Sequence, residues 1–550
     1  MTRREATRWL AWLLLSALVV LAWWNGLHGE FTYDDKVEVI GNRTIRFLSE
    51  WKVVIAYNWS RPITLLSYAA NFAFSRFEPF SYHVVDLALH AVVSGLAMLF
   101  VAELAEARGH ERPLRVGFAA AVIWALHPLQ TEAVSYVTGR SEQLCALFYL
   151  GSCWAWIRFA RHGGWHRAAL SLACLVLAFF TKEVAATLPV ALGLIELFAV
   201  RGGSLREVRW RRYAPWLLAL VAFFALRYRV YGTLTARGEV ERALDVQVFT
   251  QAEVIWRYVQ LAVLPLGQSI FQDHPETGLS LRSGLAMLGL IGLTTLAWLR
   301  RERSPELAFG WIWFLLILMP SSSVVPLKET MAEHRVHLSL LGLAWMAGFG
   351  LDRLAGRRLG WAVAALALLL GGLTVHRNTL WATEVSLWGD AVAQNPDSAE
   401  AWYGYGDALR LKKRLPEAKA AYQRSTQLDP SLRDAWNNLG LVQATMGDVK
   451  DAEATWRAVL KRSPTYCKAH NNLGLLRALD GRYEEAAAEL RTTLAYCSDD
   501  CMAHRLLGEL YGKHLDDREK ALIHLEYFLE KCPADELSDE VRKLRDDLTW

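Results

Sequence analysis

Two adjacent carboxylates, Asp34 and Asp35, directly follow the first apolar run of the chain and suit acid–base chemistry. Asp is also a preferred residue of helix caps and turns, so the pair alone does not indicate a site. More charged residues and histidines, however, lie near the ends of later apolar runs. They are His127, Glu132, Arg140, Glu142, Lys182, Glu183, Glu333, His334 and Arg335.

These charges are all predicted to lie on the outer side of a membrane. A charge near hydrocarbon is costly unless it is paired or faces water, so a cluster on one side predicts a shared polar cavity. Arg and Lys in that cavity can neutralise a departing phosphate, which leaves already ionised and needs no general acid. A carboxylate can orient an acceptor hydroxyl and take its proton. The predicted chemistry is transfer from a lipid-linked phosphate to a hydroxyl.

The composition indicates that lipid surrounds much of the 550-residue chain. Hydrophobic residues make up 53% of it and charged residues only 21%, which excludes disorder and collagen-like order. The net charge of +4 is too small for a nucleic-acid-binding surface, and no nucleic-acid partner is expected.

Eleven membrane crossings are predicted. Six arginine clusters, at 3–8, 108–115, 158–167, 201–212, 300–303 and 353–358, are placed on the cytoplasmic side by the positive-inside rule. We therefore expect a multi-pass protein of the cytoplasmic membrane, with its amino terminus inside and its carboxyl terminus in the periplasm. The predicted spans are 9–26, 84–104, 116–136, 142–160, 168–181, 184–200, 214–231, 284–299, 306–320, 336–352 and 359–376.

Two further segments of the membrane domain, residues 1–378, are predicted to lie at the membrane surface. The first outer loop, about 27–82, is the longest of the early loops and is expected to carry interfacial helices. The second segment, about 252–266, contains an apolar stretch of only about 12 residues, which is too short to cross.

The soluble tail, residues 399–550, has an internal period of 34 residues. This is the tetratricopeptide spacing, in which small residues let two helices approach and stacked helix pairs share a core. We predict about four repeats that form an α-solenoid, with residues 379–398 as a docking helix and linker. The periodic positions are Trp402, Trp436, His470 and His504, and Gly406, Gly440, Gly474 and Gly508.

Four cysteines of the tail form two pairs by spacing. Cys467 and Cys497 are 30 residues apart and Cys501 and Cys532 are 31 apart, so each pair spans one repeat. Disulfides are plausible there in an oxidising compartment, each contributing about 3 kcal/mol. Four unrelated buried thiols are the alternative.

The order of the motifs along the chain resembles that of a known family. The match is to the transmembrane and tetratricopeptide-repeat-containing O-mannosyltransferases and their bacterial relatives, in the C-type (GT-C) superfamily of polyprenyl-phosphate-sugar-dependent glycosyltransferases. The motifs are Tyr33-Asp34-Asp35, Arg61-Pro62-Ile63-Thr64, His83-x-x-Asp86-x-x-x-His90, His127-Pro128-x-x-Thr131-Glu132, Gly139-Arg140-x-Glu142, Lys182-Glu183 and Ala332-Glu333-His334-Arg335, followed by the repeats.

The resemblance implies an all-α, GT-C-like bundle and an inverting transfer of a mannose-like hexose from a polyprenyl-phosphate donor to a protein hydroxyl. It makes Asp34 the first choice for the base and Asp35 its helper, while which of the two adjacent carboxylates takes the proton stays open. We expect the donor phosphate to contact Arg335, Lys182, Arg140 and His334. Supporting or sugar contacts are expected from Glu333, Glu183, Glu132, Glu142, His127, Arg61, His83, Asp86 and His90.

The chemistry requires no cofactor, although two sets of alternatives stay open. His83, Asp86 and His90 lie on one helical stripe and are possible ligands of a divalent metal, but hydrogen bonds between buried helices explain the stripe equally well. The same transfer to a glycan or lipid is one alternative function, and a non-enzymatic scaffold using the repeats is another. A transporter is disfavoured, because the polar residues gather near one face. Expected partners are the lipid donor, membrane lipid and a protein acceptor on the concave face of the repeats.

Overall fold

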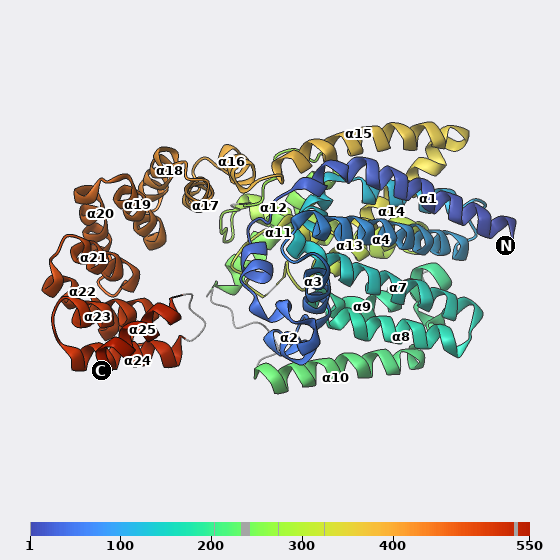
Figure 1. Cartoon of the computed structure of the whole chain (residues 1–550). Coiled ribbons are helices and arrows are strands. Elements are labelled where there is room, and N and C mark those ends of the chain that lie inside the picture. The colour runs from blue at the N-terminus through green and yellow to red at the C-terminus, as the bar shows by residue number, and fades with distance from the viewer. Residues whose placement is uncertain are drawn as a thin grey trace. The chain divides into compact units, whose positions relative to one another are not determined.

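The computed structural model describes residues 2–202, 204–232, 242–272, 274–323, 325–532 and 537–549. These residues form helices joined by turns, and no strand occurs among them. The all-α prediction is thereby confirmed. Contacts divide the chain into two compact units, Met1–Gln394 and Asn395–Trp550. Figure 1 shows the helices of each unit by their labels.

Each of the eleven predicted spans overlaps an α-helix of the first unit, and the span 116–136 overlaps two, because α5 ends at Ala125 and the short α6 (Thr131–Val134) follows it. Six helical stretches of the described residues are long and apolar enough to cross a membrane, and one of them, Leu340–Leu380, holds two of these helices. Three shorter apolar helices accompany them. α7 belongs to neither group. The helices that the eleven spans overlap are α1 (Arg3–Trp23), α4 (Pro79–Ala107), α5 (Pro113–Ala125), α7 (Arg140–His162), α8 (Trp165–Phe179), α9 (Leu188–Ile195), α10 (Ala214–Tyr231), α12 (Leu281–Leu299), α13 (Pro305–Leu318), α14 (Leu340–Ala355) and α15 (Leu359–Leu380).

Close helix packing in this bundle depends on small residues. A Cβ at Gly117 of α5 would lie 2.5 Å from the carbonyl oxygen of Met98 in α4. Cβ atoms at Gly310 of α13 and Gly342 of α14 would lie 2.5 and 2.3 Å from backbone oxygens of the facing helix. Lipid gives apolar surfaces little reason to associate, so such close approach is what holds membrane helices together.

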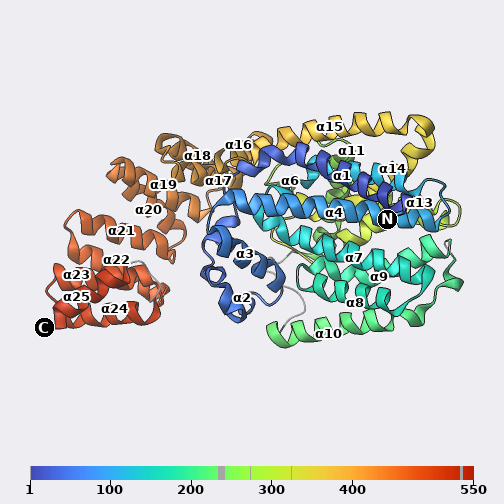
Figure 2. The same cartoon turned by 45° about the vertical axis from the view of Figure 1, so that its right-hand side comes forward.

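The segments outside the spans are also helical. The first outer loop holds α2 (Trp51–Tyr57) and α3 (Pro62–Ser75), with a small core of its own that includes Phe31, Val54 and Tyr68. Figure 2 shows α2 and α3 together at one end of the bundle.

The second surface segment is longer than the sequence indicated. It is α11 (Leu244–Val263), a helix of 20 residues, whereas hydropathy picked out only about 12. The difference arises from its first half, where Gln247 and Gln251 are buried and donate to the backbone oxygens of Ser323 and Thr330 at 2.8 and 2.9 Å. A search for runs of apolar residues does not detect the first half of this helix, because its buried residues include polar ones.

A buried ion pair joins α4 to α7. The Nε of Arg140 donates to the Oδ1 of Asp86 at 2.6 Å, and both side chains are almost completely excluded from solvent. Arg140 also donates to the backbone oxygen of Tyr82 at 3.1 Å, and its guanidinium lies over the rings of Tyr68 and Tyr82. The pair therefore fixes the register of two neighbouring helices.

The described residues of the second unit form four helix pairs, which the 34-residue period predicted, and a final helix, which it did not. In each pair the periodic glycine faces a large side chain of the second helix: a Cβ at Gly406 would lie 2.7 Å from Tyr422, and one at Gly440 would lie 2.5 Å from Trp456. The helices are α17 (Ala399–Leu411), α18 (Leu415–Leu428), α19 (Arg433–Met446), α20 (Val449–Arg462), α21 (Cys467–Leu479), α22 (Tyr483–Tyr496), α23 (Cys501–Lys513), α24 (Arg518–Lys531) and α25 (Ser538–Thr549).

Both cysteine pairs are disulfide-bonded in the structure. Cys467–Cys497 and Cys501–Cys532 have Cα–Cα distances of 6.4 and 6.3 Å. Each bond ties the start of the first helix of a pair to the end of the second. The three remaining cysteines, Cys145, Cys153 and Cys174, are free and lie in the first unit.

We predict that only three of the seven thiols react with an alkylating reagent in the denatured, unreduced protein, and that all seven react after reduction. Intact-mass measurement counts the added groups. Replacing Cys467 and Cys497 together by Ser should cost the repeat unit about 3 to 4 kcal/mol of stability, because the open loop gains entropy on unfolding. Cys174→Ser is the control and should leave the melting temperature unchanged. Seven reactive thiols before reduction would contradict the pairing.

The Arg140–Asp86 pair generates a second prediction. Arg140→Met should lower stability by about 3 to 5 kcal/mol, because Asp86 is left as an uncompensated buried charge. The double variant Asp86→Leu/Arg140→Met should recover most of that loss, because it removes both charges. Thermal unfolding of the detergent-purified proteins measures both. Equal losses in the single and double variants would mean that packing, and not pairing, determines the effect.

Candidate active site

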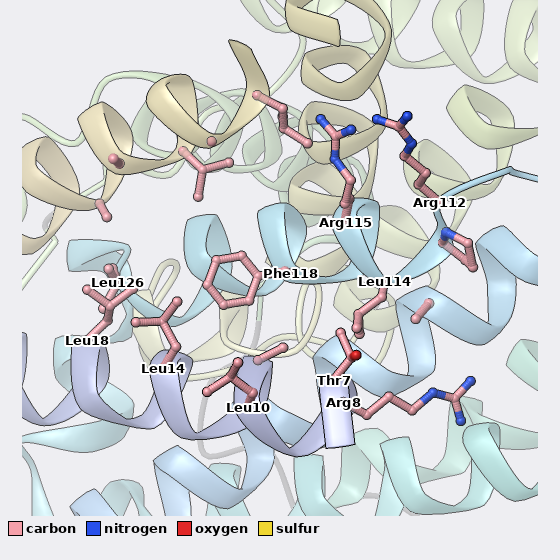
Figure 3. A pocket seen from close by; sticks show the side chains of 18 of the residues that line it. Thr7, Arg8, Leu10, Leu14, Leu18, Arg112, Leu114, Arg115, Phe118 and Leu126 are labelled. Carbon is pink, nitrogen blue, oxygen red and sulfur yellow. The ribbon is translucent and has the colours of Figure 1, made fainter. Parts of the chain in front are cut away.

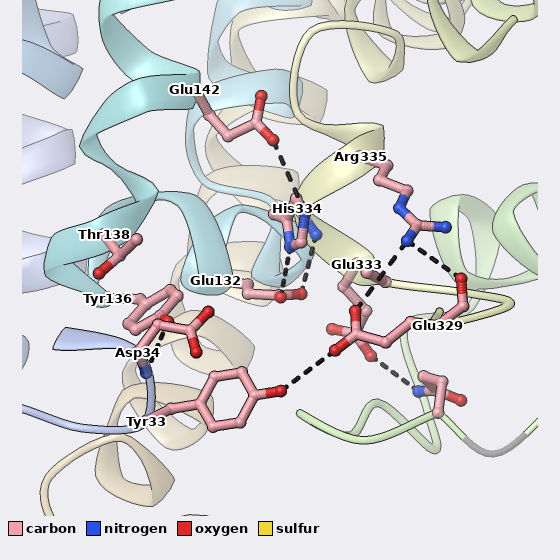
Figure 4. Close-up of polar contacts among 12 residues, drawn as sticks. Tyr33, Asp34, Glu132, Tyr136, Thr138, Glu142, Glu329, Glu333, His334 and Arg335 are labelled. Atoms are coloured by element: carbon pink, nitrogen blue, oxygen red, sulfur yellow. Dashed lines mark hydrogen bonds and ion pairs between the residues drawn. The ribbon is translucent and has the colours of Figure 1, made fainter. Parts of the chain in front are cut away.

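Asp34 lies in the loop after α1 and carries the most accessible carboxylate of the predicted site. Its side chain is exposed, and no hydrogen bond or ion pair joins its carboxylate to another residue of the described ranges. Its backbone N–H donates to the hydroxyl of Tyr136 at 3.0 Å. The preceding residue, Tyr33, has a φ of 51°, an unfavourable value for a large side chain that the surrounding contacts must hold. Figure 4 shows Asp34 between Tyr136 and Tyr33, on the side of the loop facing Glu132.

Asp35 has a different environment, although it is the next residue. It is completely buried and accepts the N–H and the hydroxyl of Thr138 at 2.7 and 2.6 Å, together with the N–H of Thr32 at 3.1 Å. Burial raises the pKa of Asp35 to about 7. Through these hydrogen bonds Asp35 joins the loop after α1 to Thr138, which lies just before α7. These contacts give Asp35 a structural role, and its predicted role as helper of the base stays a prediction.

A chain of paired groups lies beside this loop. Glu132 of α6 accepts the backbone N–H of His334 at 2.8 Å, and its other oxygen is 2.5 Å from Nδ1 of the same histidine. The Nε2 of His334 is 4.0 Å from Glu142 at the start of α7, and Glu142 is ion-paired with Lys182. Burial and the neighbouring Lys182 lower the pKa of His334 to about 3. A single proton shared between Nδ1 of His334 and the Glu132 carboxyl group satisfies this contact (Figure 4).

The predicted cations Lys182 and Arg335 surround Glu132. Burial raises the pKa of Glu132 to about 7, against the opposing effect of Arg335 and Lys182. The guanidinium of Arg335 donates to the backbone oxygen of Glu329 at 3.1 Å and lies 4.0 Å from its carboxylate. The hydroxyl of Tyr33 donates to the same carboxylate at 3.1 Å. Arg335 is thereby linked to the loop that carries Asp34.

Two more arginines, Arg61 and Arg227, contact Glu183, the residue that follows Lys182 in the chain. Glu183 is 3.2 Å from Arg61 of the first outer loop and 3.8 Å from Arg227 of α10. About a third of the Arg61 side chain is exposed, at 35%. Arg61 and Lys182 are thus held by carboxylates and remain 35% and 18% exposed, which is suitable for binding an anion, whereas the Arg335 side chain is only 8% exposed.

Arg140 does not belong to this group. It is buried beside Asp86, with its donors directed at protein oxygens, so these contacts do not support the prediction that it contacts a donor phosphate. Asp86 is its partner and is likewise unavailable to a ligand.

The other predicted residues have structural contacts. The Nε2 atoms of three buried histidines lie 3.0 to 3.1 Å from backbone oxygens: His83 from Gly29, His90 from Ala125 and His127 from Ala262. His83, Asp86 and His90 therefore have separate partners, and the described residues contain no group of three His, Cys, Asp or Glu side chains placed to hold a metal ion.

Glu333 is buried and fixes a loop. Its carboxylate accepts from the side chains of Gln268 and Gln272 and from the backbone N–H of Ser269, at 2.8 to 2.9 Å. The carboxylate is therefore occupied by the loop of Gln268, Ser269 and Gln272, and in this arrangement it is not exposed to a substrate.

Glu384 was not predicted and contacts the Asp34 loop directly. It lies at the start of α16 (Glu384–Gln394), accepts the N–H of Tyr33 at 3.2 Å and is ion-paired with Lys36. The ring of Trp388, one turn further, is 5.8 Å from that of Tyr33. Nothing in the local sequence signals these contacts, because 351 positions separate Tyr33 from Glu384.

Comparisons with known proteins agree with the motif-based resemblance. The family model for dolichyl-phosphate-mannose-protein mannosyltransferases matches residues 81–228, and the tetratricopeptide repeat model matches residues 385–433 and 435–500. The chain is also similar to the solved repeat protein YrrB, with 21% identity over 32% of this chain and 89% of that chain and a TM-score of 0.25.

Curated relatives match across both units. The chain is 22% identical over 482 residues to the human protein O-mannosyl-transferase TMTC3, covering 76% of this chain and 51% of that protein. It is 24% identical over 462 residues to the Caenorhabditis elegans protein O-mannosyl-transferase F38B6.6, covering 76% of this chain and 63% of the relative. The chain thus spans about half the length of the human relative. Taken with the apolar helices and the repeats, these matches support the resemblance to a TMTC-like family of C-type glycosyltransferases.

Proposed function

We propose that this membrane protein transfers a mannose-like hexose from a polyprenyl-phosphate donor to a hydroxyl of a protein acceptor, on the non-cytoplasmic side of the membrane. The observation that carries the proposal is the exposed Asp34 carboxylate, which no described residue pairs and which faces Glu132 (Figure 4). Glu132 is bonded to His334 and lies within the electrostatic influence of Lys182 and Arg335. The relatives named as protein O-mannosyl-transferases support the sugar and the acceptor class.

The proposed step is a single displacement. The acceptor oxygen bonds to the anomeric carbon of the sugar while the bond from that carbon to the phosphate oxygen breaks, which inverts the anomeric centre. Asp34 accepts the hydroxyl proton as the new bond forms. The electron pair of the broken bond stays on the phosphate, whose charge Lys182, Arg335 and Arg61 stabilise. The lipid phosphate then departs as an anion, and no cofactor enters the balance.

Asp34 suits the role of base better than its neighbour does. Its carboxylate is exposed, whereas the oxygens of Asp35 are occupied by Thr32 and Thr138 inside the protein. A base must reach the proton that it abstracts, directly or through one water. The positive φ of Tyr33, fixed on both sides by Tyr136 and Glu384, supports a carboxylate held in place before the substrate arrives.

The side of the membrane is inferred from the two disulfides and the charges. Disulfides persist in oxidising compartments, which favours a periplasmic location for the repeat unit. The Asp34 loop and α16 lie at the same end of α1 and α15, so the site would face that compartment too. The arginine clusters at the opposite helix ends are consistent with a cytoplasmic location of those ends. The stacked repeats would then present a protein acceptor.

The first test uses Asp34→Asn. We expect turnover to fall by at least about 100-fold with an unchanged melting temperature, because the amide cannot accept the proton but keeps the shape of the loop. The purified protein is incubated with polyprenyl-phosphate sugars and a periplasmic protein extract, and mass spectrometry records the gain of one hexose. Glu50→Gln is the matched control, an exposed acid of the same outer loop, and should retain full activity.

Two outcomes would change the proposal. Full turnover by Asp34→Asn would show that another group accepts the proton. Labelling of lipid-linked material but not of polypeptide would keep the chemistry and change the acceptor.

The second test concerns Glu384 as a positioning residue. Glu384→Gln should lower kcat by about tenfold to 100-fold while leaving the KM for the donor within about twofold, because it loosens the Asp34 loop without touching the cations. Lys36→Met should have the same effect, since it removes the other member of the ion pair. The double variant should be no worse than either single variant, because the two residues act as one unit. Additive losses, or a rise in donor KM alone, would argue against this role.

A further inference from the structure

A long groove lies on the outside of the bundle between α1, α5 and α15, with a volume of about 1430 Å³. Leu10, Leu14 and Leu18 of α1 form one wall, Phe118 of α5 forms the floor, and α15 forms the other wall (Figure 3). The side chains of Leu10 and Leu14 are 68% and 53% exposed. In a membrane such a groove holds hydrocarbon chains.

The α15 wall contains two adjacent glycines. A Cβ at Gly372 would meet nothing within 4 Å, and one at Gly371 would meet only the Cβ of Ala22, at 3.7 Å. The missing side chains therefore widen the groove and are not required for helix packing at Gly372.

One end of the groove is basic. Five arginines line it there: Arg3, Arg4, Arg8, Arg112 and Arg115. Two of them are neutralised, since Arg8 lies 3.7 and 3.5 Å from Glu103 and Glu106, and Arg115 lies 3.8 Å from Asp352.

The other three arginines of this end, Arg3, Arg4 and Arg112, are exposed and form no ion pair with a described residue. The acidic residues lining the same end are Glu106, which is shared with Arg161, and Glu111. Positive charge is therefore in excess where the apolar groove opens.

This basic end is remote from the candidate active site. The three helices run from it to the site: α1 ends just before the Asp34 loop, α5 leads to His127 and Glu132, and α15 is followed by Glu384. The 21 residues of α1 correspond to about 30 Å, the thickness of the hydrocarbon layer. An anion at the basic end is thus in the opposite leaflet from the proposed sugar transfer.

We propose that the groove binds one anionic glycerophospholipid, with its phosphate on Arg4 and Arg112 and its acyl chains along α1 and α15. An arginine fork pairs well with a phosphate, and basic residues at a membrane surface attract anionic lipids. The apolar walls accept the chains of any lipid, so the arginines supply the selectivity for charge. The site is independent of the proposed transfer.

The test measures lipid retained by the full-length protein in detergent, using native mass spectrometry. Phosphatidylglycerol and phosphatidylcholine with identical chains are titrated separately. We expect the first to bind about tenfold more tightly, and the preference to fall to about twofold or less in Arg4→Gln/Arg112→Gln. Arg300→Gln/Arg303→Gln, two exposed arginines outside the groove, is the matched control and should keep the preference.

A second pair of variants tests the chain-binding part. Gly372→Leu should fill the groove and reduce binding of both lipids at least about fivefold, because the added side chain occupies the space of a chain segment. Gly292→Leu of α12, where a Cβ also meets nothing within 4 Å, is the control and should bind normally.

Three results would overturn the proposal. They are equal affinity for the two lipids, an equal effect of both arginine pairs, and one-for-one displacement of phosphatidylglycerol by undecaprenyl phosphate. The last would assign the groove to a prenyl lipid.

Discussion

A charge close to hydrocarbon must have a partner, and this constraint shapes the whole first unit. Asp86 is satisfied by Arg140, Glu142 by Lys182, and Glu183 by Arg61 and Arg227. The presence of a charge in such a bundle therefore says little about chemistry. The informative feature is incomplete pairing, and Asp34 has it: its carboxylate is exposed while the acids around it are occupied.

The same constraint explains which predictions from sequence succeeded. Hydropathy predicted a helix at each of the eleven spans, because lipid admits few other structures. The 34-residue period predicted the repeat helices, since Gly406 and its equivalents must face a large side chain. The cysteine spacing predicted the pairs that are bonded, because the two ends of a helix hairpin are neighbours.

The site could be predicted only in part, because the sequence does not show which charged side chains form ion pairs or hydrogen bonds with one another. Arg140 and Lys182 looked alike as outward-facing cations, yet one is buried beside Asp86 and the other lies next to His334. Asp34 and Asp35 were indistinguishable until the contacts of Thr138 assigned one of them to the interior. The length of α11 was missed because its polar residues are buried by protein and not by lipid.

The first and last spans of the unit are neighbours, and this arrangement brings Glu384 to the Asp34 loop. Asn25 donates to the backbone oxygen of Val375 at 2.8 Å, and Asn378 donates to Asn25 at 3.2 Å. The segment after α15, which begins α16, therefore starts beside the segment after α1, which carries Asp34. The repeat family model starts at residue 385, within the helix whose first residue holds the N–H of Tyr33. The helix in which the repeat family model begins thus also fixes the loop of the proposed base, which gives a physical reason for its position directly after the last span.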